Sequence, residues 1–200
     1  MRTPAFRRFG RDGRGVAVVE FAILAPIVVL LYVGMVELVQ GLMAERRAAH
    51  AASAIGDLVA QTDEVTAAEV QQIFAISSVI MQPFDPDHIQ LRVTSVRVDA
   101  SGVPRVRWSD SNANWSERAV NSTVDIPEVT QSNGTEADFL GVGQSTVMAE
   151  VIYEYSSPFS EMFSNVRRWF DAGAEDHEGF TFESTFYLQP RQSDEVAYRT

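Results

Sequence analysis

The chain has 200 residues and a net charge of −11, because 27 Asp and Glu outnumber 16 Lys and Arg. From Leu38 onward the imbalance grows to eleven Arg against twenty-four acidic residues, a net charge of −13. This negative charge excludes a nucleic-acid partner, since phosphate binding requires basic clusters. The absence of Cys excludes a disulfide framework and thiol chemistry.

An apolar segment of membrane length follows a basic N-terminal stretch. From Val16 to Val36 the only charged side chain is Glu20, and about twenty helical residues at 1.5 Å each span the roughly 30 Å hydrocarbon core of a bilayer. The sequence therefore predicts a transmembrane helix over residues 16–36. An intramembrane carboxyl costs about 2.5–3.5 kcal/mol, which marks Glu20 as a candidate functional residue whose partner must come from outside its own helix.

The residues before this segment predict its orientation. They include five Arg and one Asp, and such a basic flank keeps its end of a membrane helix in the cytoplasm. We therefore expect the remaining chain on the periplasmic or outer side. A cleaved secretory signal is disfavoured, since its apolar core has about 7–15 residues and ends in a small-x-small site. A plain uncleaved anchor stays open as an alternative.

The membrane helix is expected to continue beyond the bilayer. An Ala-rich amphipathic pattern extends from Glu37 to about Gln61, and Pro26, Gly34 and Gly41 are candidate kinks. Small residues on this stretch permit close packing, either on the sheet of the same subunit or between subunits. These small residues are Gly41, Ala44, Ala48, Ala51, Ala52 and Ala54.

A second helix and a hairpin come next. Thr66 and Glu69 form a capping-box pattern, and the helical spacing that follows ends at Pro83. Residues 89–98 alternate as a strand, and the change of parity between Val93 and Val96 predicts a bulge. Turn chemistry at 99–102 leads into a returning arm at 103–108. Residues 109–143 lack sustained periodicity, which indicates a long and mostly irregular insertion.

Two more strands are predicted at residues 147–155 and 180–188, separated by a helix that begins at Ser157 with Pro158 in its first turn. The fold class is therefore α+β: a long N-terminal helix, then a domain whose mainly antiparallel sheet of about four strands packs against helices. We expect the intervening helix to cover the sheet with an aromatic stripe. Its members are Phe159, Met162, Phe163, Val166, Trp169 and Phe170.

The N-terminal third resembles the processing site of type IV pilin-like precursors. Gly15 is followed by four small apolar residues and then by Glu20 and Phe21. Within that superfamily the chain most resembles the TadE-type pseudopilins of tight-adherence (Flp) pili, over nearly its whole length. Weaker matching stretches are residues 20–26, Gly34 with Glu37, and residues 57–61, 106–110, 149–155 and 185–191.

The resemblance implies a minor pilin-like subunit with a pilin-like fold. A prepilin peptidase would cut after Gly15 and leave Val16 as the new N-terminus, and Glu20 and Phe21 would serve assembly. The implied partners are this peptidase, other pilin-like subunits, the pilus assembly machinery and the lipid bilayer. The implied location is the bacterial inner membrane, with a single pass, a cytoplasmic N-terminus and a periplasmic domain. Incorporation into an extracellular pilus stays open.

The expected organisation is a basic leader at 1–15, a transmembrane helix at 16–36, a helical stalk with a second helix at 37–82, and an α+β ectodomain at 83–200 that contains the irregular insertion. Cleavage after Gly15 would create an α-ammonium on Val16. Glu20 of a neighbouring subunit could approach this group, which would convert two costly intramembrane charges into one pair.

Other functions have weaker support in the sequence. Asp85, Asp87 and His88 in a Pro-containing turn, and the acidic cluster at 175–178, each lack a distant further ligand, so solvated loops are favoured over metal sites. Without Cys or HExxH spacing, an enzyme would need an acid-only site, so we expect no catalytic residues and no cofactor. A single-pass periplasmic binding or scaffold protein remains an alternative, as does an adhesin that acts through the insertion.

Overall fold

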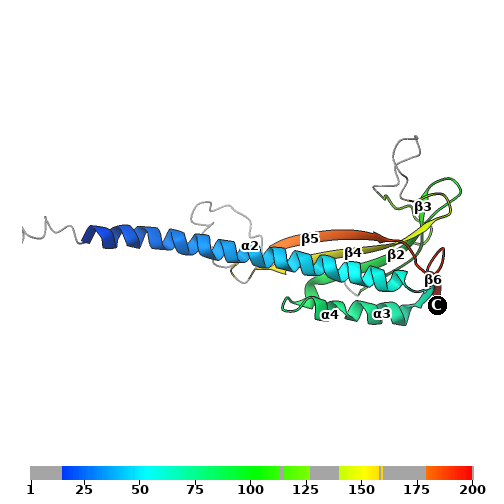
Figure 1. Ribbon diagram of the computed structural model, residues 1–200, viewed down its shortest axis with the longest axis horizontal. Coiled ribbons are helices and arrows are strands. Elements are labelled where there is room, and N and C mark those ends of the chain that lie inside the picture. The colour runs from blue at the N-terminus through cyan, green and yellow to red at the C-terminus, as the bar shows by residue number, and fades with distance from the viewer. Residues whose placement is uncertain (1–14, 113–114, 127–139, 158, 160–178, 200) are drawn as a thin grey trace, which may run out of the picture. The chain divides into compact units, whose positions relative to one another are not determined.

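A computed structural model describes residues 15–112, 115–126, 140–157, 159 and 179–199 (Figure 1). The chain divides into two compact units, Met1–Gln40 and Gly41–Thr200, and the boundary falls within the long N-terminal helix. The architecture is α+β, as the sequence predicts, with a long helix followed by a domain built on a four-stranded antiparallel sheet. Of the helix predicted to begin at Ser157, only Ser157 and Phe159 are among the described residues, and the acidic cluster at 175–178 lies outside them.

The long helix α2 (Val16–Ala60) has 45 residues and continues through Pro26, Gly34 and Gly41, so none of the three predicted kink positions ends it. A helix accepts an internal proline when only one backbone hydrogen bond is lost among many. The end at Ala60 agrees with the predicted end near Gln61. There the Thr62 hydroxyl donates to the Val59 carbonyl at 2.8 Å, which satisfies one of the last free acceptors of the helix.

Short elements connect α2 with the main sheet. The Thr66 hydroxyl accepts from the Glu69 amide at 3.3 Å, and the Glu69 carboxylate accepts from the Thr66 amide at 2.8 Å, which confirms the predicted capping box. The predicted single run to Pro83 is interrupted, because the Ser77 hydroxyl donates to the Phe74 carbonyl at 2.7 Å and competes with the backbone ladder. The elements are β1 (Glu64–Thr66), α3 (Ala67–Ala75), α4 (Ser77–Ile80) and the 3-10 helix η2 (Pro86–His88).

The main sheet has the strand order β3-β2-β4-β5, and all neighbouring strands are antiparallel. All four predicted strands are confirmed. The predicted turn between the first two is confirmed as well, since Asp99 accepts from the amides of Ser101 and Val103 while Gly102 takes the left-handed φ of +79°. The strands are β2 (Ile89–Val98), β3 (Pro104–Ser111), β4 (Ser145–Ser156) and β5 (Gly179–Leu188).

A bulge occurs at the predicted position along β2, but its extra residue lies in the neighbouring strand β3. The pairing of β2 with β3 shifts between Ser95 and Val96, which leaves Arg107 without a partner in the register. The pairing of β2 with β4 is continuous from Ile89 to Arg97. The change of parity in β2 therefore has another cause: both faces of this strand are buried, each along a different part of its length.

One face of the sheet is covered by the C-terminal part of α2. Ala44, Ala48, Ala51 and Ala52 of this helix surface are at most 1% exposed and belong to the same core cluster as sheet residues such as Leu91 and Val151, whereas Ala54 is only partly buried. Between the two alternatives that the sequence left open, the small-residue face of α2 therefore packs on the sheet of its own chain. Gly56 lies so close that an added Cβ would be 2.6 Å from Leu188 and 2.8 Å from Ala149.

The other face of the sheet is covered in part by the insertion. Val124, Ile126 and Leu140 from the insertion pack with Val106 and Met148 of the sheet. Residues 109–111, predicted as the start of the insertion, belong to β3, because their pairing with β2 continues to Ser111. The described part of the insertion after β3 has irregular structure, as predicted, with an isolated bridge between Thr123 and Arg105. Its irregular backbone is nevertheless held against the sheet.

The C-terminal residues return to the domain and form an element that sequence analysis does not predict. Strand β6 (Ala197–Arg199) pairs in parallel with β1, and the Trp108 indole donates to the Val196 carbonyl at 2.7 Å. Three residues are too few to show a strand periodicity. The contact depends on tertiary structure, since Trp108 and Val196 are far apart in the sequence.

Candidate functional site

The residues predicted to be processed lie at the start of α2. Gly15 immediately precedes the helix, Val16 is its first residue, and both are exposed. An added Cβ on Gly15 would meet no atom within 4 Å, so the packing of the described chain does not require glycine there. No described neighbour therefore imposes a small residue at Gly15.

Glu20 follows one helical turn after Val16, on the same side of the helix. It is exposed, and no Arg, Lys or His occurs from Val16 to Val36 to pair with it. Phe21 beside it is 72% exposed. The structure thus brings Gly15, Val16, Glu20 and Phe21 together on one or two turns, and the membrane-length stretch from Val16 to Val36 supplies no cation for the carboxylate.

The surroundings of Glu20 are apolar. The helix α2 contains a stretch long and apolar enough to cross a membrane, judged by length and composition, and no residue of that stretch is buried in the protein. Val18, Ile23 and Leu31 are each more than 60% exposed. Such a surface is stable in a bilayer or against other apolar helices, but not in water.

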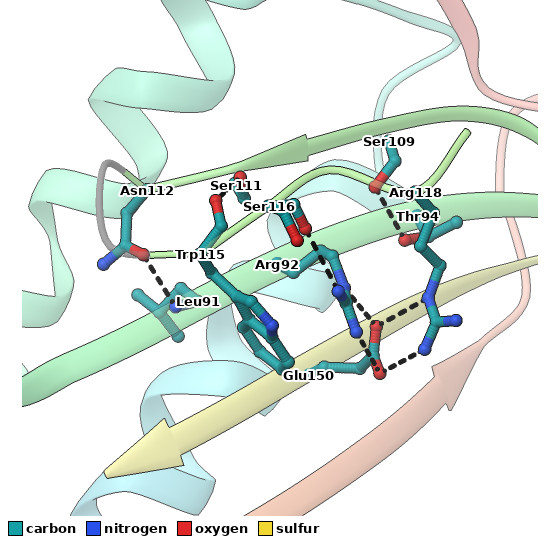
Figure 2. Close-up of polar contacts among 10 residues, drawn as sticks. All are labelled: Leu91, Arg92, Thr94, Ser109, Ser111, Asn112, Trp115, Ser116, Arg118 and Glu150. Carbon is teal, nitrogen blue, oxygen red and sulfur yellow. Dashed lines mark hydrogen bonds and ion pairs between the residues drawn. The ribbon is translucent and has the colours of Figure 1, made fainter. Parts of the chain in front are cut away.

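A second group of polar residues lies on the face of the sheet that the insertion covers (Figure 2). Arg92 of β2 forms a two-pronged ion pair with Glu150 of β4, with N···O distances of 2.8 and 2.9 Å. Arg118 from the insertion approaches the same carboxylate at 2.7 Å. The side chains of Arg92 and Glu150 are each only 10% exposed, so this pair is buried.

The chain after β3 is held by the same arginine. The Arg92 guanidinium donates to the Ser116 carbonyl at 3.1 Å and lies 3.9 Å from the centre of the Trp115 ring, a cation–π contact (Figure 2). The side chain of Asn112 accepts from the Leu91 amide at 3.0 Å and donates to the Ile89 carbonyl at 2.7 Å. These contacts fix the start of the insertion to β2.

The charge of Glu150 is compensated within this cluster by Arg92 and Arg118. Burial by itself would raise the pKa of Glu150, but the hydrogen bonds and charges of Arg92 and Arg118 outweigh it, so the pKa of this carboxyl lies below its ordinary value. Glu150 therefore stays ionised at neutral pH with both oxygens engaged. The cluster serves to join the insertion to the sheet, and its carboxylate is not available as a base.

The turn around Asp85 binds its own backbone. The Asp87 amide donates to Asp85 at 3.0 Å, which caps η2, and His88 Nδ1 lies 3.4 Å from the same carboxylate. Within the described residues there is no cluster of three or more side chains suited to a metal ion. The solvated-turn interpretation of Asp85, Asp87 and His88 is consistent with this geometry.

The C-terminal return adds a third polar group. Tyr198 of β6 donates to Asp110 of β3 at 3.0 Å, and Gln71 of α3 donates to the other oxygen of Asp110 at 2.9 Å. Burial and then the Asp110 carboxylate raise the pKa of Tyr198 to about 12. The phenol is therefore neutral at physiological pH and holds β6 against the sheet.

Sequence analysis missed both polar groups of the folded domain. A signal for the cluster around Arg92 was present in the sequence. Arg92 and Glu150 carry opposite charges, and each lies at a polar position of a strand in which apolar and polar residues alternate. Which arginine pairs with which acid depends on strand register, and the register brings Arg92 directly opposite Glu150. No such signal exists for Tyr198 and Asp110.

The comparisons with known proteins concern the N-terminal helix. The family model of TadE-like proteins matches residues 15–56, which include Gly15, Glu20 and the small-residue face up to Gly56. This match confirms the resemblance over that segment and indicates involvement in tight-adherence pilus systems. The family is one of pilus components. Searches of curated proteins and of solved structures found no match.

Proposed function

We propose that this chain, which is TadE-like over residues 15–56, is a minor pilin-like subunit that is cut after Gly15 and is needed to assemble a tight-adherence pilus. One observation carries the proposal: Glu20 is the only charged residue of the exposed apolar stretch from Val16 to Val36, which the family match covers and which offers it no cation. An acid in such a stretch has no use in a plain anchor. It has a use if a partner subunit supplies the cation.

Cleavage after Gly15 would supply that cation. The reaction hydrolyses the peptide bond between Gly15 and Val16, and the new α-amino group of Val16 is protonated at neutral pH. In an assembly of parallel helices, the Val16 ammonium of one subunit and Glu20 of its neighbour would form an ion pair in a medium of low dielectric constant. Loss of one partner would leave a buried uncompensated charge, at a cost of about 3–5 kcal/mol.

Cleavage would also change how the chain is held in the membrane. The residues before Val16 carry five Arg and one Asp, which retain that end at the cytoplasmic face. Their removal takes away four net positive charges, so the helix could leave the bilayer for a filament. The partners in this proposal are a prepilin peptidase, other pilin-like subunits, the assembly machinery and the inner-membrane bilayer, with the folded domain in the periplasm.

The test is N-terminal sequencing of the protein extracted from membranes of cells that express the complete pilus system. We expect the sequence to start at Val16, and a Gly15→Leu variant to keep residues 1–15 and a slower electrophoretic mobility. Because a side chain at Gly15 meets no described atom, this substitution leaves the folded domain intact. Gly34→Leu is the matched control, since Gly34 is also without neighbours within 4 Å, and it should be processed normally.

The alternative is a single-pass membrane-anchored binding or scaffold protein of the periplasm. It shares the membrane helix and the folded domain with the proposal and differs in maturation. Retention of residues 1–15 in the wild-type chain would favour this alternative, and cells lacking the chain would then still assemble pili.

A further inference from the structure

The C-terminal residues 191–199 are attached to the rest of the domain at both ends by ion pairs. Arg191 pairs with Asp57 near the end of α2. Arg199 pairs with Glu64 of β1 at 3.2 Å. The segment therefore runs from the end of α2 to the short strand that follows this helix in the chain.

Glu195 holds the middle of this segment to the main sheet. Its carboxylate accepts from Arg97 of β2 and from Arg107 of β3, each at 2.8 Å. The Glu195 side chain is 18% exposed, and those of the two arginines are 43% and 49% exposed. The three charges thus lie at the surface of the domain, where dissolved salt can screen them.

The bulge in β3 supplies one of these two arginines. Val106 packs on the face of the sheet that the insertion covers, and Trp108 packs on the face that α2 covers. In a regular strand, residues two apart lie on the same face, so the extra residue Arg107 allows this change of face. Bulges redirect side chains, and here the redirected side chain binds Glu195.

The charges of the segment and of its partners are opposite in sign at each contact. Along the segment the order is basic, acidic and basic, at Arg191, Glu195 and Arg199. The partners are acidic on α2 and β1 and basic on β2 and β3. A shift of the segment by four residues would bring like charges together, so the ion pairs also fix its position.

Apolar burial contributes less to this attachment than to the main sheet. Val196 is the one buried residue of the nine described residues 191–199, Tyr198 is partly buried, and five are exposed. Strand β6 pairs with β1 over three residues, whereas β4 pairs with β5 over ten. Salt screens exposed ion pairs but does not weaken apolar burial, so the segment and the main sheet should respond differently to salt.

We propose that residues 191–199 form a salt-sensitive clasp, which releases as one unit from α2, β1, β2 and β3 while the main sheet and residues 41–60 of α2 stay folded. Release takes their partners from Arg97, Arg107 and the indole N–H of Trp108, and closure occupies all three donors again. The clasp involves groups of the folded domain alone, so it does not depend on processing or on pilus assembly.

Amide hydrogen exchange of the full chain in micelles of an uncharged detergent tests the clasp. Two reporter amides lie toward its two ends. The Arg191 amide donates to the Ala60 carbonyl at 2.9 Å, and the Ala197 amide donates to the Asp63 carbonyl at 2.9 Å. Both should exchange about tenfold faster in about 1 M than in about 0.1 M NaCl, since the Debye length falls from about 10 Å to about 3 Å. The amides of β4 should change by less than about twofold.

Three outcomes would overturn the proposal. Reporter amides that do not respond to salt would show that ion pairs do not hold the segment. A response at only one of the two would show fraying of one end rather than release of a unit. An equal acceleration in β4 would show that the whole domain opens instead.

Glu195→Gln tests the central contact. It removes the charge that Arg97 and Arg107 share, so both reporter amides should exchange about fivefold faster in about 0.1 M NaCl, and the further acceleration by salt should fall below about threefold. Slow exchange in β4 shows in the same sample that the variant is folded.

Glu154→Gln is the matched control, since Glu154 is exposed on β4 and lies outside the clasp. This control should retain the wild-type rates at both reporter amides. Wild-type rates in Glu195→Gln would contradict the proposal, and so would an equal acceleration in the two variants.

Discussion

The two halves of α2 are continuous in backbone but differ in the exposure and contacts of their side chains. From Val16 to Val36 most of its apolar side chains are exposed, and its one charge, Glu20, has no partner in its own segment. From Gly41 to Ala60 most of its small residues are buried against the sheet, and Arg47 donates to the Ile80 carbonyl at 3.0 Å. The described residues therefore cover the second half of α2 and leave most of the apolar surface of the first half uncovered.

We therefore expect maturation and assembly to depend on the first half of α2, and the stability of the domain to depend on the second half. Substitutions in the first half should change maturation or assembly and leave the unfolding temperature of the domain unchanged. Substitutions in the domain should change the unfolding temperature first.

Glu20→Ala should have the largest effect, a complete loss of pilus assembly. The Val16 ammonium of a neighbouring subunit would then lack its partner in a medium of low dielectric constant, at a cost of about 3–5 kcal/mol per contact. Electron microscopy of the cells and thermal unfolding of the purified chain are the two measurements. Normal pili in Glu20→Ala cells would refute the assembly role, and an altered unfolding temperature would break the separation.

Glu150→Gln should destabilise the folded domain by about 3 kcal/mol, because both Arg92 and Arg118 lose their carboxylate while Arg92 stays buried. For a unit of this size the melting temperature should fall by roughly 6–12 °C, as measured by thermal unfolding of the full chain in micelles. Glu154→Gln, an exposed position on the same strand, is the control and should leave the melting temperature unchanged.

The same cluster predicts a dependence on pH. The pKa of Glu150 is lowered in the folded state from its ordinary 4.5, so its contribution to stability is fully present above about pH 4.5 and is lost as the pH falls through the lowered value. The melting temperature of the wild-type chain should therefore fall below about pH 4.5 more steeply than that of Glu150→Gln. Parallel curves for the two proteins would contradict the assigned ion pairs.

Gly56→Ala should cost about 1–2 kcal/mol, since the new methyl group would lie 2.6 Å from Leu188 and 2.8 Å from Ala149 and would force the helix and the sheet apart. The gain in helix propensity of about 1 kcal/mol only partly offsets this. Gly34→Ala tests the other half of α2, where the new methyl group would meet no atom within 4 Å, and should cost nothing. Equal effects at the two glycines would remove the contrast between the halves.

Tyr198→Phe should have the smallest effect, a loss of about 1 kcal/mol, because only the hydrogen bond from its hydroxyl to Asp110 is removed. Gln71 continues to donate to the same carboxylate, so Asp110 keeps a partner. Chemical denaturation of the full chain in micelles would measure the change. A loss of several kcal/mol would mean that the C-terminal return supports more of the domain than its contacts indicate.

Local patterns in the sequence predicted most of the fold because they arise from short-range causes. The alternation in β4 and β5, the capping box at Thr66 and the turn at Gly102 each depend on residues close together in the sequence. The bulge illustrates the limit. The parity of β2 indicated an irregularity, but the register with β3 decided that Arg107 is the extra residue.

Part of the candidate site could likewise be predicted from the sequence, and part could not. Gly15, Val16, Glu20 and Phe21 could be identified from the sequence, because a charge within an apolar segment is visible without a fold. The Arg92, Glu150 and Arg118 cluster could not, because its three members come from β2, β4 and the insertion. Their pairing follows from strand register and from the path of a chain segment that has no periodicity.

The sequence was enough to predict the long helix, its membrane-length stretch with the one acid Glu20, and the strands of the main sheet, since each is set by the spacing of apolar and polar residues along a short stretch. Tertiary contacts determine which surface the small residues of α2 cover, how the insertion is held, and which strand pairs with β1. Those outcomes depend on contacts between residues far apart in the chain, and no local spacing records them.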